Sequence, residues 1–448
     1  LELDDVFSTD IQGENEDDLV VAAENTMLRV KTGQLTEMVA LLNLLEVFMK
    51  CTAEGYLDFV HLTSAALAKL LCYPTSSDLS PITSELRDAL YPCWAELVGV
   101  SGTQGSLNGS LVSELVQNFV DQVGSDLVKA DEADEIASMA SGIVTILHRA
   151  GIGTLRAEQV QRICELAVAE INQSFQRDGA VFEEQASSND PPSTDSETDD
   201  EHKCRNELLG IITACMKADA RAFIASTWPT LQILLQQWFS SYGHLGGAKL
   251  ALHLASDICQ HLGEEAVALL TGCMDQIIKA LNSRSKEERH WAAFTVNFAA
   301  RSAAFAPFAS RAVERLKGQL EGDGEIAALI QLCLAHPTAC ADIGSCWALC
   351  LEALPLKAEI SECCRLNKCI FAEVQAGSLK GLLAARALGY LCEVSGNKEL
   401  CDEELQTALS ESLKQLPEKA YNDLFSVLTS AQQKKLQRIV SPGPKSAW

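Results

Sequence analysis

Aromatic residues are scarce in this sequence. Phe, Trp and Tyr together make up 6% of its 448 residues, although 47% of the residues are hydrophobic. Ala and Leu therefore dominate the apolar set, and these small or unbranched side chains favour close packing of helices over sheets. A single compact domain rarely grows to this length, so we expect several domains or one elongated repeat array.

Basic residues are also in short supply. Lys and Arg number 35 against 61 Asp and Glu, which gives a formal net charge of -26. This charge argues against nucleic acid as a partner and against an anionic membrane surface, because both would be repelled. It favours a basic partner, which such a field attracts over long distances. The alternative is that the acidity only keeps the protein soluble.

The sequence shows no disulfide framework, signal peptide or membrane-spanning run. Its 17 cysteines are odd in number and scattered, mostly among apolar neighbours, as buried reduced thiols are. This indicates a reducing compartment, the cytosol or the nucleus. The most apolar stretch, Ala327 to Pro355, is interrupted by polar residues, so we expect no membrane insertion. Because the chain starts at Leu1 within an acidic run, we expect it to be a piece of something longer.

Helical patterning runs through most of the chain. Residues 1–18 carry eight acids and no base, which predicts a disordered acidic lead-in. From Leu19 onward, helix-length segments alternate with short breaks, and paired helices recur about every 40 residues, as in HEAT repeats. We see no convincing strand pattern. The predicted fold is all-α, an α-solenoid of stacked HEAT-like helix pairs in a right-handed superhelix, because each pair must bury its apolar face against its neighbours.

The predicted array has one interruption. Eight acids and no Lys or Arg lie between Glu183 and Glu201, with two prolines and several serines, which predicts a disordered acidic loop over residues 183–203. HEAT-like repeats are expected over residues 19–182 and 204–440, followed by a tail at 441–448. The clearest unit spans residues 246–321. Its predicted buried positions are Leu250, Leu252, Leu254, Ile258, Leu262, Val267, Leu270, Met274, Ile277, Ile278 and Leu281.

Motifs for chemistry are absent. The sequence has no G-x-S-x-G elbow, no phosphate-binding glycine loop and no H-E-x-x-H, so we predict no enzyme, no catalytic residues and no cofactor. His253, Asp257 and His261 share a helix face, but the outer pair lies about 12 Å apart along the axis, so a local hydrogen bond is favoured over a metal. A zinc site is conceivable from His336, Cys340, Cys346 and Cys350, but without close CxxC spacing a buried packing role is favoured, and we predict no metal.

Two residue types are candidates for binding another protein. Tryptophans are frequent anchors at protein interfaces. Those of this chain fall within apolar helical patterns, so core packing is favoured for most of Trp94, Trp228, Trp238, Trp291 and Trp347. Acids on the second helices of repeats are candidates for contacting basic cargo, and the candidates are Glu264, Glu265 and Asp275. The alternative for these acids is that water alone solvates them.

Several stretches resemble one family. They are Val30–Glu37, Thr227–Leu231, Asp257–His261, Trp347–Lys357 and Leu428–Gln433. In order and spacing these stretches resemble the carboxy-terminal half of the importin-beta (karyopherin-beta) nuclear transport receptors, in the branch that contains importin five. The similarity is collinear over roughly residues 19 to 440. The chain is richer in Ala and Cys than those relatives, so individual cargo contacts cannot be transferred.

The resemblance implies a protein-binding nuclear import receptor. Such a receptor carries basic cargo, such as nuclear localisation signals or ribosomal and histone-like proteins, and shuttles between cytoplasm and nucleus through nucleoporins of the pore. The family binds Ran-GTP mainly through amino-terminal repeats, so Ran-GTP control is expected through a missing amino-terminal part. The alternative is a HEAT scaffold of another kind, such as a phosphatase scaffold or a ribosome-assembly or chromosome-associated protein.

Overall fold

The computed structural model describes residues 7–8, 18–23, 26–71, 80–102, 109–187, 196–240 and 245–440. The chain divides into two compact units, residues 1–250 and 251–448. Almost all described residues of both units are helical, and the all-α class of stacked HEAT-like helix pairs is confirmed. The predicted tail at 441–448 lies outside the described residues. No helix in these ranges is long and apolar enough to cross a membrane.

The first unit opens with a small sheet, which corrects the prediction of helix from Leu19. Strands β1 (Phe7–Ser8), β2 (Asp18–Ala23) and β3 (Thr26–Lys31) pair antiparallel in the order β1-β3-β2, with Ala23 opposite Thr26. Two residues therefore separate β2 from β3, the commonest spacing of a hairpin. Strand pairing at residues 7–8 and 18 also contradicts disorder there, and the rest of the predicted lead-in lies outside the described residues.

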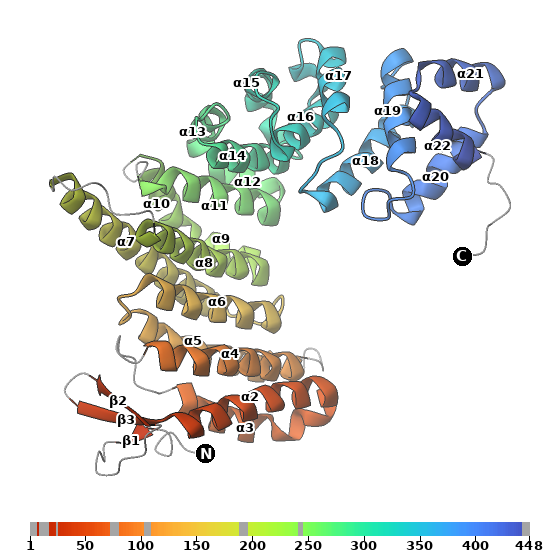
Figure 1. The fold of residues 1–448 in the computed structure, drawn as a ribbon. Coiled ribbons are helices and arrows are strands. Elements are labelled where there is room, and N and C mark those ends of the chain that lie inside the picture. Colours follow the sequence, from red (N-terminus) through yellow and green to blue (C-terminus); the bar gives the residue numbers. More distant parts are fainter. Residues whose placement is uncertain are drawn as a thin grey trace. The chain divides into compact units, whose positions relative to one another are not determined.

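Helices of the first unit stack in two layers (Figure 1). One layer holds α2 (Thr32–Thr52), α4 (Ser80–Gly102), α6 (Ala133–Ala150) and α8 (Ser196–Ala218), each packed against the next. The other holds α3 (Val60–Leu71), α5 (Gly109–Leu127), α7 (Ala157–Ser187) and α9 (Ala220–Ser226). Helix η1 (Ala53–Phe59) joins α2 to α3, and α10 (Trp228–Ser240) follows α9. Helix α11 (Gly247–Leu262) begins in the first unit, but most of its residues belong to the second. This alternation is the pairing expected of HEAT-like repeats.

The acidic interruption is shorter than predicted. Residues 183–187 continue α7 and residues 196–203 begin α8, so only residues 188–195 of the predicted loop remain, outside the described residues. Glu, Gln and Ala at 183–186 are good helix formers, which explains the continuation of α7. The acids at 197–201 fall in the opening turns of α8, where the helix dipole favours negative charge.

The second unit continues with helices and short 3₁₀ turns. They are α12 (Glu264–Leu270), η5 (Thr271–Cys273), α13 (Met274–Ala280), α14 (Lys286–Ala299), η6 (Ala303–Phe305), α15 (Ala306–Lys317), α16 (Asp323–Ala335), η7 (Pro337–Ala339), α17 (Ile343–Ala353), α18 (Ile360–Gln375), α19 (Gly381–Val394), α20 (Glu403–Lys414), α21 (Glu418–Val427) and α22 (Ser430–Val440). All eleven buried positions predicted between Leu250 and Leu281 are buried. Helix α14 begins after Ser285, whose side chain caps it by accepting from the Glu288 N–H.

Single residues in the core set the close contact between the neighbouring helices α4 and α6. A Cβ at Gly142 of α6 would lie 2.3 Å from the Tyr91 ring of α4, so only glycine allows the two helices this approach. On the same two helices, the Arg87 guanidinium donates a hydrogen bond to the Glu135 carboxylate, and the two side chains are 1% and 6% exposed. A buried charge needs such a partner, because removing it from water is costly.

We expect Arg87→Met to lower the free energy of unfolding by about 3–5 kcal/mol, because it leaves the Glu135 carboxylate buried and unpaired. Adding Glu135→Leu should recover much of the loss. Urea denaturation followed by circular dichroism measures both effects. The control is Arg162→Met, which breaks the exposed Arg162–Asp121 ion pair of 2.9 Å and should cost about 1 kcal/mol or less. Equal losses in Arg87→Met and Arg162→Met would contradict the role of burial.

Candidate functional site

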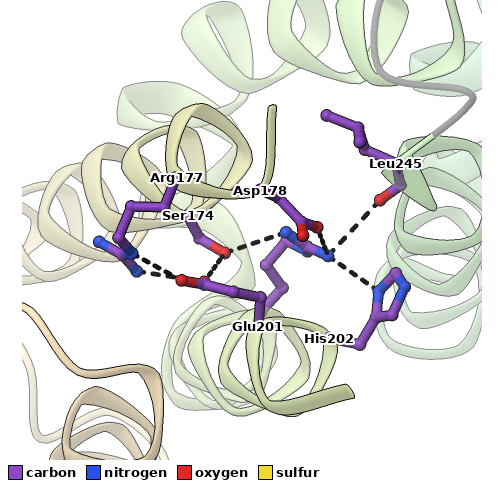
Figure 2. Close-up of polar contacts among 7 residues, drawn as sticks. Ser174, Arg177, Asp178, Glu201, His202 and Leu245 are labelled. Carbon is purple, nitrogen blue, oxygen red and sulfur yellow. Dashed lines mark hydrogen bonds and ion pairs between the residues drawn. The ribbon is translucent and has the colours of Figure 1, made fainter. Parts of the chain in front are cut away.

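A buried polar network joins α7 to α8 beside the acidic interruption (Figure 2). Glu201 on α8 accepts hydrogen bonds from the Ser174 hydroxyl at 2.5 Å and from the Arg177 guanidinium at 2.6 Å, both on α7. Arg205, one turn further along α8, donates to the Asp178 carboxylate at 2.8 Å. The network therefore fastens together the two helices that flank the acidic interruption.

The same network reaches the start of α11. The Arg205 guanidinium also donates to the Leu245 carbonyl at 3.5 Å, and it lies 2.9 Å from Nδ1 of His202. Gly246 has φ of +79° and would place a Cβ 2.4 Å from Cε1 of His202, so glycine is required there on both counts. Since these groups are directed at one another, the network positions the helices that carry them.

Glu170 lies near this network but remains apart from it. It is fully buried on α7, and neither of its carboxylate oxygens has a hydrogen-bond partner among the residues that the structure describes. Burial raises the pKa of Glu170, the positive charge of Arg177 opposes the rise, and the nearby Glu201 carboxylate adds to it. A buried carboxylate with a raised pKa binds a proton more readily in the folded chain than in the unfolded one.

The three predicted acidic residues lie at the starts of two short helices in the second unit. Glu264 and Glu265 are exposed in the first turn of α12. Asp275 is exposed in the first turn of α13, where its carboxylate forms a 2.7 Å ion pair with Arg311 of α15. The Asp275 charge is therefore partly neutralised, whereas no ion pair of Glu264 or Glu265 is found within the part of the chain that the structure describes. These two are better placed to meet a basic partner.

Most of the tryptophans are core residues, as predicted. Trp94, Trp228, Trp238 and Trp347 are between 0% and 5% exposed, whereas Trp291 on α14 is only partly buried. The Trp291 ring stacks on the imidazole of His253, with centroids 3.8 Å apart, and the His253 ring lies 4.0 Å from the Asp257 carboxylate. Trp291 is therefore held rigidly with part of its indole accessible.

Trp291 forms one wall of a groove of about 450 Å³ at the start of α14. The other lining residues are Lys286, Glu287, Arg289, His290, Glu321, Gly322 and Glu325. An aromatic face beside carboxylates suits an ammonium or guanidinium group, which both attract. The apolar helical pattern predicted that Trp291 lies in the core. That pattern does not reveal that the neighbouring turn leaves the Trp291 side chain accessible.

The charges in this groove favour a cationic ligand. Arg289 is already engaged, since its guanidinium donates to the Glu321 carboxylate and the Ser283 carbonyl, both at 2.9 Å. Glu325 on α16 is 4% exposed; its Oε1 lies 4.0 Å from Arg289 Nε, and its Oε2 has no hydrogen-bond partner among the described residues. A donor from a bound chain would supply the hydrogen bond that this buried oxygen lacks.

The structure rearranges the predicted metal candidates. His336 is directed away from the thiols, because its Nε2 lies 3.0 Å from the Ala300 carbonyl oxygen. Cys340 and Cys346 come together, and the third member of the cluster is Cys333 at the end of α16, which the spacing did not single out.

Comparison with known proteins gives a fold. No protein-family model matches the chain, and no curated protein matches it significantly. The structure is similar to solved structures of the karyopherin Kap121p bound to RanGTP (14% identity, TM-score 0.67, covering 94% of this chain and 39% of that one) and to the extreme C-terminus of the phosphatase Cdc14p (12%, 0.67, 97% and 40%). A third is Kap121p bound to Nup53p (13%, 0.65, 95% and 39%).

The chain spans about two fifths of the length of these karyopherin structures. At this level of identity, the likeness shows the fold, that of karyopherin HEAT-repeat solenoids. The resemblance to karyopherin-beta receptors that the sequence indicated is thereby confirmed in structure.

We expect Glu170→Gln to stabilise the chain at pH 7 and to have little effect at pH 4. Below its ordinary pKa of 4.5, Glu170 is protonated in both the folded and the unfolded chain. As the pH rises, Glu170 ionises first in the unfolded chain, so the folded chain loses stability until the pH passes the raised pKa of Glu170 in the folded chain. Gln does not ionise, so the Glu170→Gln chain does not lose stability in this way. Thermal unfolding from pH 4 to pH 8 measures the difference, with the exposed Glu165→Gln on the same helix as control. A benefit that does not grow with pH would contradict an ionisable buried Glu170.

Proposed function

We propose that the chain is part of a nuclear import receptor of the karyopherin-beta type, which binds basic cargo proteins and has no catalytic activity. The observation that carries this proposal is the likeness to Kap121p structures over 94–97% of the chain. Several of those structures hold a protein partner, such as the Cdc14p terminus or Nup53p. Kap121p therefore uses this fold to bind other proteins.

Charge supports a basic cargo. The net charge of -26 would draw a Lys/Arg-rich segment toward the chain before contact. On arrival, we propose that one basic side chain enters the groove beside Trp291 and reaches Glu325, while Glu264 and Glu265 hold neighbouring positive charges. Asp275 has a lesser part, because it must first release Arg311. A nuclear localisation signal or a ribosomal or histone-like protein has the required chemistry.

Control by Ran-GTP and passage through the pore belong to the same proposal. Kap121p has been solved with RanGTP and with Nup53p. We propose that Ran-GTP acts on this protein through an amino-terminal part beyond the present sequence, and that contacts with nucleoporins allow shuttling between cytoplasm and nucleus.

A HEAT scaffold of another kind is the second candidate. The buried ionic cross-links between helices suit any solenoid, and such a scaffold would hold fixed protein partners without responding to Ran-GTP. A pull-down with Ran-GTP, using the full-length protein, distinguishes the two. Cargo release on adding Ran-GTP supports the receptor, and a partner retained unchanged supports the scaffold.

We expect Trp291→Ala to weaken binding of a basic import-signal peptide by about 2- to 30-fold, mainly through faster dissociation. A cation held over an indole contributes about 0.5–2 kcal/mol.

Changing Glu264→Gln, Glu265→Gln and Asp275→Asn together should instead slow association of the peptide, because exposed charges act on the encounter. Raising the salt concentration should have the same effect. Surface plasmon resonance or stopped-flow fluorescence separates the two rates.

The matched control carries Asp131→Asn, Glu132→Gln and Glu158→Gln, which remove the same charge from exposed positions of the first unit. It should slow association less than the triple change in the second unit. A scrambled peptide of equal charge tests specificity. Equal affinity for the two peptides at physiological salt would remove the case for a specific cargo site in this chain.

A further inference from the structure

Three buried thiols meet where α16 turns into α17. Cys333 lies near the end of α16, Cys340 directly follows η7, and Cys346 lies in the first turns of α17. Their Sγ atoms all lie within 4.8 Å of one another. A fourth buried thiol, Cys350, lies one turn beyond Cys346 and is in hydrogen-bonding contact with Cys333.

We propose that Cys333, Cys340 and Cys346 form a site for a thiophilic metal ion, Zn²⁺, with Cys350 as the nearest candidate for a fourth ligand. Structural zinc sites are tetrahedral, use three or four cysteines and have Zn–S bonds of about 2.3 Å, which places the sulfur atoms about 3.8 Å apart. The cluster therefore needs to contract by only about 1 Å.

The turn that carries the site is held at both ends. Before it, His336 contacts the Ala300 carbonyl oxygen at 3.0 Å; after it, the Asp342 carboxylate caps α17 by accepting from the Ser345 N–H at 3.1 Å. Pro337, Thr338 and residues 341–343, which flank Cys340 in the sequence, are exposed, so the thiol of Cys340 belongs to a turn most of whose other residues face solvent. A pre-formed and reachable set of ligands is what a metal site requires.

The raised pKa values of the thiols oppose loss of their protons, so a metal ion has to displace these protons as it binds. Hydrogen bonding to Cys333, followed by burial, raises the pKa of Cys340; burial, followed by the Cys340 charge, raises the pKa of Cys346. The thiols are therefore protonated at neutral pH in the metal-free chain, and Zn²⁺ would displace one proton from each ligand to the buffer as each Zn–S bond forms. Lys317 lies close enough to lower both pKa values, and it offsets part of the negative charge of a zinc–thiolate centre.

Cobalt titration of the fully reduced chain tests the proposal, because Co²⁺ takes the place of zinc and its bonds to thiolate absorb strongly. One equivalent of Co²⁺ should give sulfur-to-metal charge-transfer bands and the visible bands of a tetrahedral ion, and Zn²⁺ should remove them. Binding should strengthen as the pH rises, because protons are released. Native mass spectrometry should find one zinc per chain after dialysis.

Variants separate this cluster from the other cysteines. Cys340→Ser with Cys346→Ser should abolish the cobalt bands, while Cys259→Ser, a buried cysteine outside the cluster, should keep them. Circular dichroism checks that each variant is folded. If the double variant does not fold, the single variant Cys340→Ser, next to the exposed turn, provides a less disruptive substitution. Absence of the bands in the reduced wild-type chain, or their persistence in a folded variant, would overturn the site and leave the thiols as packing residues.

Discussion

Charged side chains are buried between neighbouring helices in both units, and several of them pair across the contact between two helices. Arg87 meets Glu135 across α4 and α6, Arg205 meets Asp178 across α7 and α8, and Arg289 lies beside Glu325 across α14 and α16. Apolar stripes can slide against one another at little cost, but a buried guanidinium has only one favourable position relative to a buried carboxylate. These pairs therefore set the register of layers that Ala and Leu only hold together.

The helices and their buried faces could be predicted from the sequence, because apolar residues at helical spacing mark a face that has to be covered. All the predicted stripe positions between Leu250 and Leu281 are buried. The hairpin of β2 and β3 could not be predicted, since a short apolar run such as Leu19–Ala23 fits a strand or a helix equally well and the pairing partner decides. The acidic interruption was overestimated for a related reason, because good helix formers at its edges were judged by charge alone.

The groove beside Trp291 and the thiol cluster were missed because both depend on turns between helices. Spacing along the sequence suggested His336 as a partner for Cys340 and Cys346, whereas the turn directs His336 to the Ala300 carbonyl and brings Cys333 in from α16. Scattered cysteines are usually small core residues, and most of the cysteines that the structure describes are buried, as expected. What separates the cluster from the rest is only its three-dimensional placement, which composition does not contain.

Ion pairs between arginines and acidic residues determine which carboxylates of this acidic chain keep an unbalanced charge. Many arginines form ion pairs that join one structural element to another. The pairs are Arg149 with Glu96, Arg177 with Glu201, Arg301 with Glu362, Arg311 with Asp275 and Arg386 with Glu352. Each such pair neutralises one acid, and the pairs of Arg311 with Asp275 and of Arg386 with Glu352 do so at the surface. With 61 acids against 35 Lys and Arg, the remaining carboxylates repel one another and weaken the compact state. A partner rich in Lys and Arg would relieve that repulsion as it binds, which is the physical reason for proposing a basic cargo.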